Sequence, residues 1–164
     1  MRTFEGFMTL VAELDGDVAE IERVRGQNAR AWDRIRSGAD DPIDWGALGF
    51  TIHTLYGVAE NYFLRVSKFF ENSLPPERWH RALLEKMALD IPGLRPALFT
   101  ASAQLGDAVE IMKFRQRMRN LYGEDLDPGK TGDIQVLASR FFDVFPEVHR
   151  NFRDRLLAVA EALR

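Results

Sequence analysis

The apolar residues of this sequence recur at helical spacing along nearly the whole chain. They follow one another at intervals of three and four from Phe7 to Ile35, from Leu48 to Phe69 and from Ile134 to Leu163. Such spacing places apolar side chains on one face of an α-helix, whereas a half-buried strand needs strict alternation. No alternating stretch, internal repeat or low-complexity tract interrupts the pattern. The sequence therefore predicts an all-α protein.

Proline, glycine and capping residues divide this pattern into elements. We expect a first helix over about residues 5 to 36, ended by the segment from Gly38 to Pro42. Asp44 is the expected N-cap of a second helix, because its carboxylate can accept from the free backbone N–H groups there. The pair Pro75-Pro76 ends that helix and opens a short one that runs to about Met87.

Two further helices complete the expected set. Residues 92–96, with two prolines and a glycine, precede a third long helix that runs to Tyr122. The last helix opens at Asp127-Pro128, an N-cap acceptor followed by proline at the first helical position. Pro146 is expected to kink or divide this last helix, because proline removes a backbone hydrogen bond.

Four long helices joined by short connections predict an antiparallel up-down four-helix bundle with a short additional helix. The chain has 164 residues, enough for one hydrophobic core, so we expect a single domain over residues 1–164. Several helices carry more aromatic residues than one apolar face requires. Because surplus apolar surface is typical of an interface, the sequence favours a homodimer. The surplus residues are Trp45, Phe69, Phe70, Phe141 and Phe142.

Composition and charge exclude several classes of function. The absence of cysteine excludes disulfides, thiol nucleophiles and cysteine-bound zinc. No two of the 3 histidines have the spacing of metal ligands, so we expect neither a metal nor another cofactor. A net charge of -3 is unlike that of a basic nucleic-acid coat, so any RNA contact must be local. No apolar stretch is long enough for a membrane span and no signal peptide is evident, so we expect a cytoplasmic protein.

A basic segment lies at the end of the third long helix in this otherwise acidic chain. Residues 113–122 contain three arginines, a lysine and a tyrosine. On an ideal helix Arg115, Arg119 and Tyr122 lie within about 60° of one another, at positions i, i+4 and i+7. Their heads can share one anion, for which the arginine fork is well suited. Alternatively, the arginines only complement the helix dipole and solvate one face.

The same segment resembles the motif of a known family. The residues from Arg115 to Tyr122 are similar to the Arg-x4-His-x-Tyr motif of HepT-like proteins, with Asn120 in the histidine position. Residues 47–56 resemble the second helix of that family, and residues 79–84 resemble the short segment after it. On these motifs the chain is identified as a member of the HepT-like proteins, which belong to the helical HEPN group.

This resemblance implies an activity and a partner. HepT-like proteins are toxins of bacterial toxin–antitoxin pairs, and their metal-independent ribonuclease site lies in a cleft between two protomers. Their partner is a small nucleotidyltransferase antitoxin of the MNT type, which transfers AMP to the motif tyrosine. The resemblance implies that Arg115 contacts the scissile phosphate of RNA and that Tyr122 is the adenylylation target. Asn120 occupies the place of the catalytic histidine.

This asparagine changes the activity that we expect. Histidine exchanges protons near neutral pH because its ordinary pKa is about 6.5, whereas an amide does not titrate there. The catalytic group of Arg115, Arg119, Asn120 and Tyr122 is therefore predicted to be weak or degenerate as a ribonuclease. Regulation through Tyr122 is favoured over RNA cleavage. Two alternatives stay open: a non-catalytic substrate-binding subunit of a two-component nucleotidyltransferase, and a helical homodimer with an unrelated role.

Three residues of the second helix are further candidates for this site. His53, Tyr56 and Glu60 lie on one helix face, at positions i, i+3 and i+7. In one interpretation His53 is a partly buried residue with satisfied hydrogen bonds. In a sharper hypothesis, His53 or Glu60 lines the same cleft as Arg119 and replaces the missing base. His80 is expected on the surface or in an interface.

Overall fold

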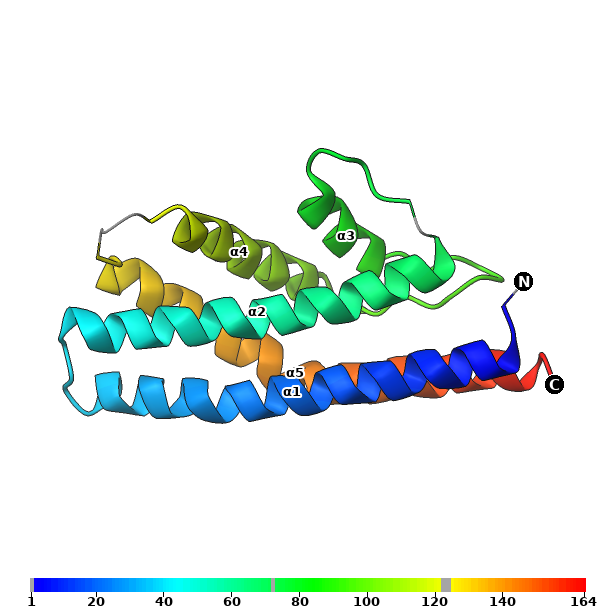
Figure 1. Cartoon of the computed structure of the whole chain (residues 1–164), viewed down its shortest axis with the longest axis horizontal. Helices are drawn as coiled ribbons and strands as arrows, with labels where there is room; N and C mark the ends of the chain where they lie inside the picture. The colour runs from blue at the N-terminus through cyan, green and yellow to red at the C-terminus, as the bar shows by residue number, and fades with distance from the viewer. Residues whose placement is uncertain (1, 72, 122–124) are drawn as a thin grey trace.

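The computed structural model describes residues 2–71, 73–121 and 125–164, and the chain folds into an all-helical bundle. Its helices are α1 (Phe4–Arg36), α2 (Pro42–Phe70), α3 (Trp79–Met87), α4 (Ser102–Arg119) and α5 (Pro128–Glu161). The four longer helices run alternately in opposite directions, and the short α3 lies beside α2 (Figure 1). The predicted all-α bundle with a short extra helix is therefore confirmed. No described helix is long and apolar enough to cross a membrane.

Local capping chemistry sets the starts of the long helices. Thr3 accepts a hydrogen bond from the backbone N–H of Gly6 at 3.1 Å and caps α1. The aspartates of two Asp-Pro pairs cap the helices that follow them: Asp41 before α2, and Asp127 before α5 as predicted. The prediction of Asp44 as the cap of α2 is wrong. Asp44 lies in the first turn, where its carboxylate pairs with Arg34 of α1 at 2.9 Å.

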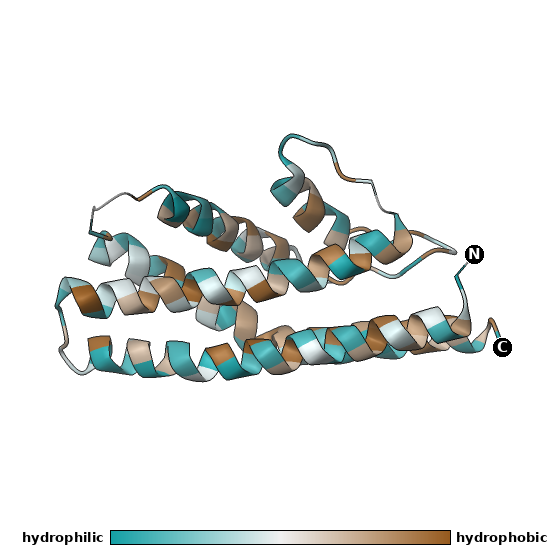
Figure 2. Cartoon of the chain, viewed as in Figure 1, coloured by the Kyte–Doolittle hydropathy of each residue, from teal (hydrophilic) through white to brown (hydrophobic). Residues whose placement is uncertain are grey.

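The apolar faces of the helices meet in one hydrophobic core. Figure 2 shows hydrophobic residues recurring along each long helix between hydrophilic ones. The aromatic residues that were expected to be surplus belong to this core instead. Phe70, Phe141 and Phe142 are buried, and Trp45 and Phe69 pack against the core while partly exposed. The prediction of a free apolar surface is therefore wrong for the three buried residues, while Trp45 and Phe69 keep part of their surface exposed.

Three helix limits differ from those predicted. The helix α3 begins at Trp79 rather than at Pro75-Pro76, and α4 begins only at Ser102. Among the described residues α4 ends at Arg119, while Tyr122, its predicted end, lies outside them. The last helix is not divided, because it continues through Pro146.

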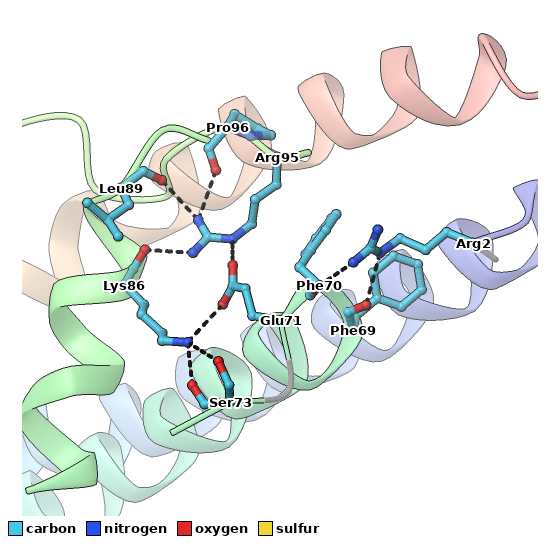
Figure 3. Close-up of polar contacts among 9 residues, drawn as sticks. All are labelled: Arg2, Phe69, Phe70, Glu71, Ser73, Lys86, Leu89, Arg95 and Pro96. Atoms are coloured by element: carbon cyan, nitrogen blue, oxygen red, sulfur yellow. Dashed lines mark hydrogen bonds and ion pairs between the residues drawn. The ribbon is translucent and has the colours of Figure 1, made fainter. Parts of the chain in front are cut away.

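A buried arginine explains why α4 starts late. Arg95 is 2% exposed and forms an ion pair with Glu71, the C-cap residue of α2. Its guanidinium also donates to the carbonyls of Lys86, at 2.7 Å, and Leu89, at 3.0 Å, at the end of α3 (Figure 3). These contacts hold residues 88–101 in a non-helical path between α3 and α4. They also satisfy backbone carbonyls that a helix end leaves without partners.

Two buried polar networks fix how α1, α2 and α5 pack together. The amides of Asn28 and Gln135 bond to each other at 2.8 and 2.9 Å, joining α1 to α5. Near the middle of the bundle, the ring of His149 bonds to the Tyr62 hydroxyl at 2.9 Å and to the Asp15 carboxylate at 2.7 Å. Because buried polar groups need partners, each network favours one alignment of the three helices.

Candidate functional site

The basic end of α4 lies against the middle of α2, because the two helices run antiparallel (Figure 1). The approach of the segment before α5 is close at Gly49 of α2, because a Cβ atom there would overlap the side chain of Leu126. Gly57 lies beside Arg115, where a Cβ atom would be in ordinary contact at 3.7 Å from Nη2. Gly49 thus lets Leu126 lie directly on the surface of α2. This packing positions Arg115 beside the predicted site residues of α2.

Arg115 is held by a buried carboxylate and an aromatic ring. Its Nη1 donates to Oε1 of Glu60 at 3.1 Å, and Glu60 is 6% exposed. The guanidinium carbon lies 5.8 Å from the centroid of the Tyr56 ring, within the range of a cation–π contact. The Nε atom is buried and has no hydrogen-bond partner among the described residues. A guanidinium carries five N–H donors, so donors of Arg115 remain for an anion.

The second oxygen of Glu60 holds a histidine from another helix. His80 lies in the first turn of α3, and its Nδ1 is 2.7 Å from Oε2 of Glu60. The neighbouring Trp79 ring stacks on the imidazole, with centroids 3.6 Å apart. The His80 side chain is 20% exposed, so it lies partly at the surface, where it was expected on the surface or in an interface. Glu60 therefore joins α2 to both α3 and α4.

His53 lies close enough to the two arginines of α4 to sense their charges. Burial lowers the pKa of its imidazole below the ordinary value, and the positive charges of Arg115 and Arg119 lower it further. Its Nδ1 is buried and has no partner among the described residues, so the interpretation as a satisfied histidine is not supported. Arg119 itself is exposed. His53, Arg115 and Arg119 thus share one cationic neighbourhood.

The remaining candidates of the predicted site are one buried tyrosine, one exposed asparagine and Tyr122. Tyr56 is buried, and burial and the Glu60 charge raise the pKa of its phenol, against the effect of Arg115. Its hydroxyl is therefore neutral near neutral pH and is a poor nucleophile. Asn120 is the exposed C-cap of α4, where its backbone N–H donates to the Arg117 carbonyl at 3.1 Å. Tyr122 lies outside the described residues.

The sequence did not indicate the contact between His80 and Glu60. The two residues are 20 positions apart and belong to different helices, so no helical spacing relates them. The one local signal for His80 was that a histidine follows a tryptophan at the start of a short amphipathic segment. The Glu60–Arg115 pair spans 55 positions and was equally hidden from local patterns.

Two surface hollows lie away from these residues. A groove of about 690 Å³ runs between α1 and α2 near Gly6 and Lys68, and another of about 580 Å³ lies between residues 90–96 and the end of α5. Within residues 2–71, 73–121 and 125–164, no group of three His, Asp or Glu side chains could hold a metal ion.

The fold and this site define an all-helical protein in which one buried carboxylate positions an arginine and a histidine beside the basic end of a helix. Within that class, the chain belongs to the HepT-like protein family, whose sequence pattern matches residues 47–156. The matched span covers more than half of the chain and extends from α2 into α5. No curated protein and no solved structure matches the chain.

The shared neighbourhood of His53 and Arg119 can be tested by titration. Replacing Arg119→Gln removes a positive charge that disfavours the imidazolium, so the pKa of His53 rises toward its ordinary value. The measurement is an NMR titration of imidazole C–H signals, with His53 assigned by its loss in His53→Gln. Arg164→Gln, at the far end of α5, is the control and leaves the pKa unchanged. A pKa that is indifferent to Arg119→Gln would contradict the placement.

Proposed function

We propose that this chain is the HepT-like component of a bacterial toxin–antitoxin module. In this proposal Arg115 and Arg119 bind phosphates of RNA, and an MNT-type nucleotidyltransferase regulates the chain by transferring AMP to Tyr122. The observation that carries the proposal is how the guanidinium of Arg115 is held. This residue is fixed by Glu60 and Tyr56, yet it keeps N–H donors without partners among the described residues.

The electrostatics favour an anionic ligand at this site. Glu60 offsets the charge of Arg115, but the exposed Arg119 adds a second positive charge, which also lowers the pKa of His53 after burial and Arg115. A phosphodiester offers oxygens that suit the planar donors of arginine. The net charge of the chain is -3, so the attraction for RNA is confined to this region.

The burial of the other tyrosines supports Tyr122 as the modified residue. The chain has 3 tyrosines, and both Tyr56 and Tyr62 are buried, with exposed fractions of 2% and 0%. A nucleotidyltransferase needs access to the phenol oxygen, which neither buried residue offers. Transfer forms a bond between this oxygen and the α-phosphorus of ATP, releases pyrophosphate, and gives the phenol proton to water. The new negative phosphate lies three residues from Arg119 in sequence and competes with RNA for the arginines.

An adenylylation assay tests this regulation. The chain is incubated with an MNT-type nucleotidyltransferase from a neighbouring gene, ATP and Mg²⁺, and its intact mass is measured. We expect one AMP per chain on the parent protein and on Tyr62→Phe, but none on Tyr122→Phe. The modified chain should bind RNA at least about tenfold more weakly, because a repelling charge has been added beside the arginines. No adduct, or an adduct that persists in Tyr122→Phe, would refute the proposal.

We also propose that two copies of the chain pair through the face of α2 beside this site. Ile43 and Phe50, seven positions apart on one side of α2, are 81% and 61% exposed. They lie on the same helix as His53, so a second copy covering them would border the cationic region. A second copy that covers both side chains removes their apolar surface from water, which favours the pairing.

Light scattering in solution tests this pairing. The parent chain should have the mass of a dimer, and Phe50→Asp should shift it to a monomer, because a buried unpaired carboxylate is costly. Val136→Asp is the matched control, since Val136 is similarly exposed, at 57%, but lies on α5. A monomeric parent chain, or a dimer that Phe50→Asp leaves intact, would contradict the proposal.

A further inference from the structure

The motif predicted from sequence has no histidine to take a proton from RNA, because Asn120 stands in that position, and His53 or Glu60 was the hypothesised replacement. The structure supplies such a group from α3. We propose that His80, oriented by Glu60, is the general base of a ribonuclease site that it forms together with Arg115. This inference rests on the proposed binding of RNA by the arginines and assigns a catalytic role to a residue outside their motif.

The carboxylate of Glu60 contacts both His80 and Arg115. Oε2 of Glu60 is 2.7 Å from Nδ1 of His80, and Oε1 is 3.1 Å from Nη1 of Arg115. An arginine that binds the phosphate and a histidine that takes a proton are thereby placed on the two sides of one buried group. Glu60 is committed to these two contacts, and its side chain is 8% exposed. We therefore assign it the role of a positioning residue and not of the base.

The contact with Glu60 also selects which ring nitrogen of His80 carries the proton. Of the two neutral tautomers, a carboxylate on Nδ1 favours the one that carries its proton on that nitrogen, which leaves the lone pair of Nε2 free to accept. The stacked Trp79 ring fixes the ring plane, and the 20% exposure of the side chain leaves a path to substrate.

The other two histidines are less suited to this role. His149 is 5% exposed, and its two ring nitrogens bond to Tyr62 and Asp15, away from α4. His53 faces the positive charges of Arg115 and Arg119, which oppose the uptake of a proton. Among the described residues, no carboxylate bonds to its ring to offset them.

The reaction requires no further reactant. Nε2 of His80 takes the proton of a ribose 2′-hydroxyl, and the 2′-oxygen forms a bond to the adjacent phosphorus. The bond from phosphorus to the 5′-oxygen of the next nucleotide breaks, and that oxygen takes a proton from the imidazolium or from water. The products are a 2′,3′-cyclic phosphate and a 5′-hydroxyl. Arg115 stabilises the negative charge on the phosphate oxygens during the transfer.

The test compares RNA cleavage with RNA binding in matched variants of the full chain. The probe is a fluorescent single-stranded RNA of mixed sequence, with cleavage measured at single turnover and affinity measured by anisotropy. His80→Asn keeps an N–H donor for Glu60 but cannot take a proton. We expect it to slow cleavage by about 100-fold or more, the range of general base catalysis, while affinity changes less than about twofold. Arg81→Asn, the next residue of α3, should leave the rate unchanged.

A second readout separates catalysis from structural support. Imidazole added to His80→Ala should restore part of the cleavage rate, whereas it should not restore the rate of Arg115→Ala. Circular dichroism of each variant shows whether the fold is kept. Cleavage that vanishes in Arg115→Ala also excludes a contaminating nuclease.

The outcomes distinguish this inference from the proposed function. If His80→Asn cleaves RNA as fast as the parent chain, the role of His80 is overturned and the proposed RNA binding stands. If the parent chain binds RNA through Arg119 but does not cleave it, the role of His80 is likewise overturned and the RNA binding stands. Neither binding nor cleavage by the parent chain would overturn the RNA function and this inference together.

Discussion

The geometry of the site depends on one buried carboxylate. Glu60 lies in the middle of α2, and removal of its charge from water is costly unless the charge is paired. The partners come from two other helices: His80 from α3 and Arg115 from α4. Because loss of Arg115 leaves the buried carboxylate without a positive charge beside it, and loss of His80 leaves Oε2 without its hydrogen-bond partner, the three helices are constrained to meet at this point. The constraint brings the guanidinium of Arg115 and the imidazole of His80 to one carboxylate.

A second ion pair completes the placement of α3. Arg95 bonds to Glu71 at the end of α2 and to the carbonyl of Lys86 at the end of α3 (Figure 3). The short helix is therefore tied to α2 at its first turn by Glu60 and near its last turn by Glu71. A nine-residue helix is marginal by itself, so these contacts and its buried apolar residues hold it in place. The position of His80 thus follows from contacts at both ends of α3.

The sequence predicted those features that residues close together in the chain determine, namely the long helices and some of their caps. Apolar residues at intervals of three and four predicted the long helices, and Asp127-Pro128 predicted the start of α5 correctly. The same Asp-Pro signal at Asp41 could have corrected the start of α2. The start of α4 could not have been predicted in this way, because Arg95 and its partner Glu71 are 24 positions apart. The contacts of Glu60 with His80 and Arg115 were hidden for the same reason, although Glu60 was a candidate from its helix face.

The central claim is that Glu60 and Arg115 act as one coupled unit in the folded chain. A double-mutant cycle on the free energy of unfolding tests it most directly, with Glu60→Gln, Arg115→Gln and the double variant unfolded in urea at one protein concentration. We expect the double variant to be more stable than the sum of the single effects predicts, with a coupling energy above about 1 kcal/mol. Single effects that add to within about 0.5 kcal/mol would show that the two residues act independently and would contradict the account.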